Sequence, residues 1–135
     1  MDNKLVECFS EQVNAEQLSP LIWAYVGDAV YELYVRVKLL AGGHFTPHNI
    51  HTKVVQFVKA AKQASLLEEL NEYLNEREQN IVRRGRNVKS NVPKSTDMIT
   101  YRHSTGFEAL IGYLYLSGDH ERLWDLLEKI GIGVD

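Results

Sequence analysis

One long segment without strong helix breakers dominates this chain of 135 residues. Ser19 and Pro20 favour an N-cap followed by a first helical position, and Gly42-Gly43 favours a helix end. Residues 21–41 between them contain one glycine, Gly27. One apolar stripe at helical spacing consists of Val26, Val30, Leu33, Val37 and Leu40. Because other apolar residues cover much of the remaining surface, we expect a central, buried helix and an all-α fold around it.

Further helices are predicted along the middle of the chain. Thr46 and Pro47 repeat the cap-and-proline signal and open a helical region whose apolar face extends to Ala61. A second stretch covers about residues 64–74, and a shorter, polar helix follows over about 76–84. The alternation of helical segments with short breaks is typical of a helix bundle.

The last third of the chain contains a predicted loop and two more helices. Residues 85–100 contain Gly85, Pro93 and many small polar residues, which indicate a loop. An apolar helix is expected over about 104–117, and Asp119 is expected to cap the last helix. The buried side of that last helix is predicted to consist of Leu123, Trp124, Leu126, Leu127 and Ile130.

Composition limits the classes of protein that fit. The length suits a single domain over residues 1–135, with 44% apolar and 24% charged residues, as in soluble globular proteins. The single cysteine, Cys8, excludes an internal disulfide and any zinc site built from several cysteines. No signal-peptide pattern and no apolar run long enough to cross a membrane are visible. A cytoplasmic protein without membrane contact is therefore expected.

Two carboxylates interrupt apolar segments that are far apart in the sequence. Asp28 lies within residues 25–33, and Glu108 lies within residues 104–112. An unpaired buried carboxylate is costly, and a shared Mg²⁺ would remove that cost. Glu108 shares its helix sector with three small residues, Thr105, Ala109 and Gly112. Such a face permits close approach of another backbone, and the helix that carries Asp28 is the natural candidate.

The spacing alone leaves other interpretations open. Asp28 could cap a break at Gly27, and Glu108 could accept a hydrogen bond from a buried tyrosine hydroxyl. Glu32 lies one turn after Asp28, and we expect it at the surface or bonded to a tyrosine. His103 could be a hydrogen-bonding neighbour of the helix that carries Glu108.

Basic residues are concentrated in one part of a chain whose net charge is −3. Residues 83–102 carry six basic residues against Asp97 alone, a local charge of +5. These six residues, here called the basic cluster, are Arg83, Arg84, Arg86, Lys89, Lys94 and Arg102. The concentration predicts a localised anion site. Alternatively, the cluster could pair with the glutamate-rich run over residues 68–78.

Several motifs resemble one enzyme family. Residues 25–32, with the core Gly-Asp-Ala-Val, resemble the signature helix of the ribonuclease III catalytic domain. Residues 107–112 resemble the second acidic helix of that family, and order and separation agree over nearly the whole chain. Ordinary members also carry acids at the positions of Ala24 and Thr105, so two of four expected carboxylates are absent.

These departures resemble the Mini-ribonuclease III subfamily, which consists of the catalytic domain without a double-stranded-RNA-binding domain. The similarity extends to residues 83–90, 93–97 and 100–105. The resemblance implies an all-α ribonuclease III catalytic domain with Mg²⁺ as cofactor, for which Mn²⁺ could substitute. Asp28 would be the principal metal ligand and catalytic residue, and Glu108 the second.

The resemblance also implies an endoribonuclease that cleaves double-stranded RNA, leaves 5′ phosphates and acts as a homodimer. Maturation of the large-subunit ribosomal RNA precursor is the expected role by analogy. The basic cluster would contact RNA phosphates without reading sequence. The rival hypothesis is a non-catalytic, ribosome-associated RNA-binding module of the same fold. A plain helical interaction protein would leave Asp28 and Glu108 unexplained.

Overall fold

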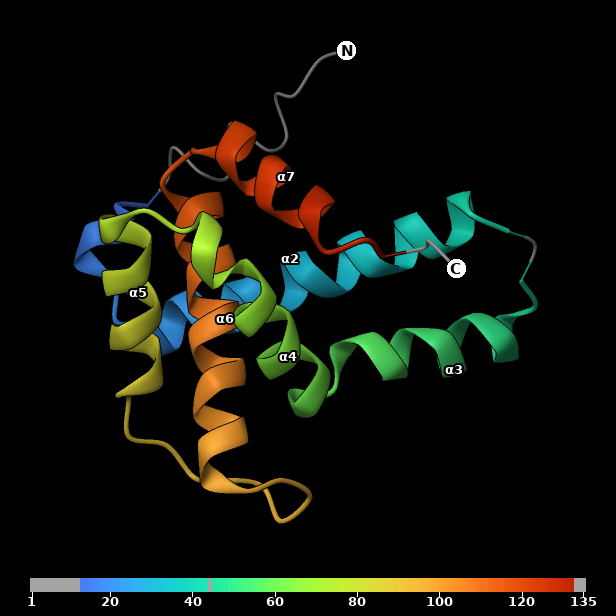
Figure 1. Cartoon of the computed structure of the whole chain (residues 1–135), viewed down its shortest axis with the longest axis horizontal. Coiled ribbons are helices and arrows are strands. Elements are labelled where there is room, and N and C mark those ends of the chain that lie inside the picture. Colours follow the sequence, from blue (N-terminus) through green and yellow to red (C-terminus); the bar gives the residue numbers. More distant parts are fainter. Residues whose placement is uncertain (1–12, 44, 133–135) are drawn as a thin grey trace.

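The computed structural model describes residues 13–43 and 45–132, and within these ranges it contains helices and no strand (Figure 1). The α-helices are α2 (Pro20–Ala41), α3 (Pro47–Val58), α4 (Ala60–Leu70), α5 (Glu76–Arg86), α6 (Met98–Leu116) and α7 (His120–Lys129). Two short 3-10 helices are η1 (Ala15–Gln17) and η2 (Asn71–Tyr73). The predicted all-α fold is confirmed. None of the described helices is long and apolar enough to cross a membrane.

Helix α6 is the centre of the bundle. It packs against α2, α4, α5 and α7, and Figure 1 shows it with α5 on one side and α4 on the other. Two edge-to-face aromatic pairs, each with ring centroids 5.0 Å apart, join it to α2: Trp23 with Tyr113, and Tyr31 with Phe107. The prediction that residues 21–41 form the central, buried helix is therefore wrong, because α6 takes that place.

Helix α2 buries one side and exposes the other. Its core side consists of Trp23, Ala24, Gly27, Tyr31, Tyr34, Val35 and Leu39. The predicted stripe is divided: Val26 and Val30 are half-buried against the core, whereas Leu33, Val37 and Leu40 are 64%, 55% and 56% exposed. The stripe is therefore only partly buried, and α6 packs against the side of α2 that carries Gly27.

The backbones of α2 and α6 touch where the two helices cross. A Cβ atom on Gly27 would lie 1.8 Å from the carbonyl oxygen of Glu108, and one on Gly112 would lie 1.7 Å from that of Trp23. Neither position has room for a side chain, so glycine is required at both. The predicted close approach to the small-residue face of α6 is confirmed at Gly112.

Helix α5 packs on α6 through a second glycine contact. Gly85 is buried inside α5, where a Cβ atom would lie 2.7 Å from the Cβ of Ala109 and 3.0 Å from the Cα of Gly106. The helix predicted over about residues 76–84 is confirmed, but it continues to Arg86, so the prediction that Gly85 begins a loop is wrong. A glycine selected for close helix packing has the same signature in sequence as one that ends a helix.

The predicted loop is shorter than expected at its other end as well. Asp97 caps α6 by accepting a hydrogen bond from the Thr100 amide at 2.8 Å, so the helix begins at Met98 rather than near residue 104. Thus Arg102 belongs to α6, and only residues 87–97 connect α5 to α6.

Smaller differences concern two other helices. The backbone turns at Lys59 between α3 and α4, so Ala61 lies on α4 rather than on the helix opened by Thr46. Trp124 of α7 was expected to be buried but is 55% exposed, with its ring edge-to-face against Tyr34 at 5.7 Å. Asp119 stands at the N-cap of α7 as predicted, although its side chain makes no capping bond.

The glycine contact predicts a strong effect of one added methyl group. Gly27→Ala should lower the free energy of unfolding by about 3 kcal/mol, because its Cβ would force the two helices apart. Urea unfolding followed by circular dichroism measures this. In Gly43→Ala the new Cβ would meet only Phe45 at 3.4 Å, and a change below about 1 kcal/mol is expected. Equal effects of the two substitutions would contradict the contact.

Candidate active site

The glycine crossing brings Asp28 and Glu108 together. Asp28 follows Gly27 on α2, and Glu108 contributes the backbone carbonyl that faces Gly27. Both residues line one cavity of about 300 Å³ between α2 and α6. Asp28 is exposed and Glu108 is half-buried, so the expectation of two buried carboxylates is wrong for Asp28 and met only in part for Glu108. Asp28 therefore lies toward solvent and Glu108 is recessed.

The surroundings of Glu108 favour its protonated form. Burial, followed by hydrogen bonding and charge repulsion from Asp28, raises the pKa of Glu108 to about 9. Near neutral pH Glu108 therefore keeps its proton. A cation between them would displace the proton from Glu108.

The alternative interpretations of the two acids do not fit this geometry. Helix α2 continues through Gly27, so Asp28 does not cap a break there. The buried Tyr31 hydroxyl donates to the carbonyl of Phe57 at 2.8 Å rather than to Glu108. Glu32 forms an ion pair with Arg36 at 2.7 Å, which confirms its predicted surface role.

Gln63 is a site residue that the sequence interpretation missed. Its side chain is 2% exposed, and its Nε2 donates to the Val58 carbonyl at 3.1 Å and to Oε2 of Glu108 at 3.3 Å. The second bond opposes the rise in the pKa of Glu108 and fixes the carboxyl group. A signal was present, because Gln63 continues the buried stripe of Leu66, Leu67 and Leu70 on α4. A polar residue within a core stripe needs a polar partner.

The donor set fits a divalent cation held mainly through water. Ala24 and Thr105, where ordinary ribonuclease III members carry acids, line the same cavity as Asp28 and Glu108. The Thr105 hydroxyl donates to the Tyr101 carbonyl at 3.0 Å and supplies no charge. Within residues 13–43 and 45–132, no cluster of three or more His, Cys, Asp or Glu side chains could hold a metal ion. Two carboxylates with several waters suit Mg²⁺, which dehydrates reluctantly.

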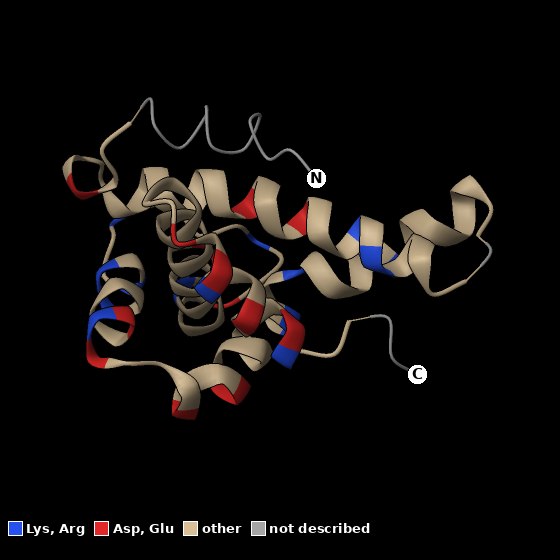
Figure 2. Cartoon of the chain, turned by 90° about the horizontal axis from the view of Figure 1, so that it is seen from above, with Lys and Arg blue, Asp and Glu red and all other residues tan. Residues whose placement is uncertain are grey.

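All six residues of the basic cluster are exposed. Three of them lie in the last turn of α5, two in the 87–97 connection and one on α6. Figure 2 shows how the basic and acidic segments are distributed over the helices. The guanidinium of Arg84 lies over the Trp23 ring, 4.7 Å from its centroid. No ion pair joins the cluster to the glutamate-rich run in the described part of the chain. Glu78 of that run pairs with Arg122 at 2.8 Å instead.

The raised pKa of Glu108 predicts a pH-dependent effect of its removal. A group that binds its proton more tightly when folded stabilises the fold at low pH, and that stability is lost as pH rises from about 4.5 to about 9. Glu108→Gln should remove this loss of stability at high pH, because glutamine carries no ionisable group. In metal-free buffer the variant should therefore gain thermal stability over the parent between pH 5 and pH 9, by on the order of 5 °C.

Differential scanning calorimetry at both pH values measures this shift. Glu69→Gln, a substitution at an exposed carboxylate of α4, is the control and should follow the parent. A melting temperature of Glu108→Gln that parallels the parent at every pH would show that Glu108 ionises normally.

Comparison with known proteins agrees with this arrangement. Residues 21–119 match the family model described as "Ribonuclease III domain". The chain is 50% identical over 112 residues to the Mini-ribonuclease 3 of Thermoanaerobacter sp. (strain X514), covering 82% of this chain and 79% of that protein. It is 43% identical over 128 residues to the Mini-ribonuclease 3 of Clostridium tetani, and this match covers 93% of this chain and 84% of that protein.

A solved structure is also similar. The crystal structure of protein FN1578 from Fusobacterium nucleatum superimposes with a TM-score of 0.77 at 28% identity, covering 84% of this chain and 93% of that one. Fold, matched segment and curated relatives therefore agree. This chain belongs to the ribonuclease III family and is similar to its Mini-ribonuclease 3 members.

Proposed function

We propose that this chain is a Mg²⁺-dependent endoribonuclease that cleaves double-stranded RNA and leaves 5′ phosphates. Membership of the ribonuclease III family supports RNA endonuclease activity. The observation that carries the finer proposal is the placement of Asp28 and Glu108 in one cavity at the crossing of α2 and α6.

The two carboxylates have different roles in this proposal. Asp28, which is exposed, is the principal metal ligand and needs no rearrangement to meet a hydrated ion. Glu108 is the second ligand, and it must lose its proton before it can contribute charge. Gln63 holds the Glu108 carboxyl group in place during this change. A bound Mg²⁺, or Mn²⁺ in its place, would activate a water and stabilise the leaving 3′ oxygen.

The basic cluster is the proposed contact surface for RNA phosphates. Its side chains are exposed and free of ion pairs with the neighbouring glutamates among the described residues. Contacts of this kind supply affinity without sequence readout, and duplex RNA is recognised mainly by shape. By analogy with the subfamily, we propose the large-subunit ribosomal RNA precursor as the natural substrate and the cytoplasm as the location.

The exposed apolar side of α2 supports a homodimer. Leu33 and Val37 of α2 are 64% and 55% exposed, and Trp124 of α7 is 55% exposed. All three line an apolar cavity of about 320 Å³ between α2 and α7. An exposed apolar patch of this kind marks an interaction site. We propose that a second copy covers it across a two-fold axis, which supplies one active site for each RNA strand.

Metal-dependent cleavage tests the catalytic proposal. With long duplex RNA and Mg²⁺ the parent protein should produce fragments with 5′ phosphates, and Asp28→Asn should lower the rate by at least about 100-fold. Glu32→Gln changes a carboxylate on the same helix that pairs with Arg36, and it should cleave at nearly the parental rate. Salt-sensitive RNA binding without cleavage by the parent would favour the non-catalytic binding module instead.

Charge on the exposed side of α2 tests the homodimer. The double substitution Leu33→Glu and Val37→Glu should give a folded monomer, because burying two carboxylates at a symmetric interface is costly. Sedimentation velocity measures the mass, and circular dichroism checks the fold. Tyr73→Glu, at an exposed aromatic residue of η2, should leave the dimer intact. A monomeric parent, or a dimer that survives the double substitution, would exclude this interface.

A further inference from the structure

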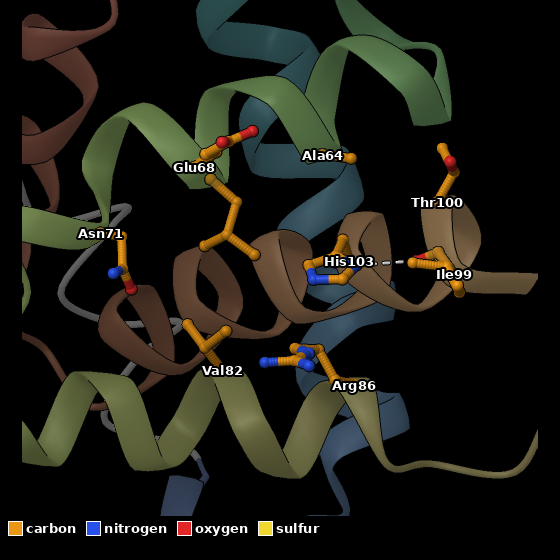
Figure 3. A pocket seen from close by; sticks show the side chains of 9 residues that line it. Ala64, Glu68, Asn71, Val82, Arg86, Ile99, Thr100 and His103 are labelled. Carbon is orange, nitrogen blue, oxygen red and sulfur yellow. Dashed lines mark hydrogen bonds between the residues drawn. The ribbon is translucent and has the colours of Figure 1, made fainter.

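A second cavity, of about 390 Å³, lies between α4, α5 and α6 (Figure 3). It shares no lining residue with the cavity of Asp28 and Glu108. Leu67 and Val82 give it apolar walls, while Glu68, Arg86 and His103 bring one acid, one base and one imidazole from three different helices. Its size is within the range of small-molecule sites, and its mixture of apolar surface with a few polar groups is typical of them.

Two of the polar residues of this cavity, Arg86 and His103, make contacts with α6. The stem of Arg86 packs against α6, where a Cβ atom on Gly106 would lie 2.8 Å from its Cγ. The Nδ1 of His103 lies 2.8 Å from the Ile99 carbonyl oxygen, as the dashed line in Figure 3 marks. A carbonyl only accepts, so Nδ1 is the donor, and Nε2 of the neutral ring remains an acceptor.

The arrangement selects a particular kind of ligand. Glu68 offers only acceptors from α4, and Arg86 offers only donors from α5 on the other side of the cavity (Figure 3). Within the described ranges neither side chain forms an ion pair with another residue. A neutral, flat ligand with donors along one edge and acceptors along another would satisfy both walls and cover Leu67 and Val82 with its faces.

Guanine has this pattern, and we propose that the cavity binds a guanine base. Its N1–H and N2 amino groups would donate to the Glu68 carboxylate, and its O6 and N7 would accept from the Arg86 guanidinium. Adenine carries an amino group where guanine has O6 and has no hydrogen on N1. It would therefore place a donor toward Arg86 and leave Glu68 without its full set of partners, which a polar site rejects strongly.

The source of the guanine follows from the place of the cavity. Arg86 is the one residue of the basic cluster that lines this cavity, so it contacts a base while the other five contact phosphates. It immediately precedes the 87–97 connection. Paired bases in duplex RNA hide the edges that this cavity reads, whereas unpaired nucleotides expose them. If the chain binds duplex RNA as proposed above, the cavity selects duplexes with an unpaired guanosine beside the bound segment. A free guanine nucleotide offers the same base chemistry.

Binding of nucleoside monophosphates to the metal-free protein tests the site without reference to cleavage. Guanosine 5′-monophosphate should shift the NMR resonances of His103 and bind about tenfold or more tightly than adenosine 5′-monophosphate. Glu68→Gln should abolish that preference, and the control Glu69→Gln, which changes an exposed neighbour outside the cavity, should retain it. Equal binding of the two nucleotides, no binding at millimolar concentrations, or a preference that survives Glu68→Gln would overturn the proposal.

Duplexes with a single bulged nucleotide distinguish the two sources. Without divalent cations, a duplex with a guanosine bulge should bind more tightly than one with an adenosine bulge. Glu68→Gln should make the two affinities equal. A preference for free guanosine monophosphate without a preference for the bulge would assign the site to a free nucleotide and overturn the RNA source. Because these are binding measurements, they remain valid even if the protein fails to cleave RNA.

Discussion

Direct backbone contact between α2 and α6 determines the rest of this structure. At Gly27 and Gly112 each helix occupies the space where the other would carry a side chain. The contact sets the depth at which the two helices pack and the register in which their residues face one another. The aromatic pairs of Trp23 with Tyr113 and of Tyr31 with Phe107 surround the crossing and hold it together. A larger residue at either glycine would move the core and the active site at once.

The same contact explains why the acids lie in an unfavourable position. Asp28 follows Gly27, and Glu108 lies one turn before Gly112, so close packing of the glycines forces the carboxyl groups together. The fold accommodates this through a proton on Glu108, whose pKa is raised to about 9, and through the amide of Gln63. A site that keeps one excess proton in the absence of metal is prepared to exchange it for a cation.

Much of this arrangement could be predicted from local sequence. The caps at Ser19, Thr46 and Asp119 stand where expected, since capping depends on residues that are adjacent in the chain. The small-residue face of α6 correctly indicated a close helix contact. Family resemblance supplied the pairing of Asp28 with Glu108, which spacing alone left open.

The errors concern choices that only tertiary packing makes. Apolar residues cover much of α2, and periodicity could not tell that Leu33 and Val37 are exposed. Gly85 reads as a breaker, yet it is buried in α5 because α6 approaches at Ala109. Gln63 comes from a helix distant in sequence from both acids, so its bond to Glu108 depends on how α4 packs against α6.

Proton release on metal binding tests whether a cation takes the place of the proton on Glu108. If Mg²⁺ or Mn²⁺ binds between Asp28 and Glu108, the proton that Glu108 holds near neutral pH must leave. Calorimetric titration at pH 7 in buffers of different ionisation enthalpy counts the protons released per ion. We expect a value close to one for the parent protein and close to zero for Glu108→Gln. Metal binding by the parent without proton release would contradict this expectation, because the ion would then lie elsewhere or Glu108 would already be ionised.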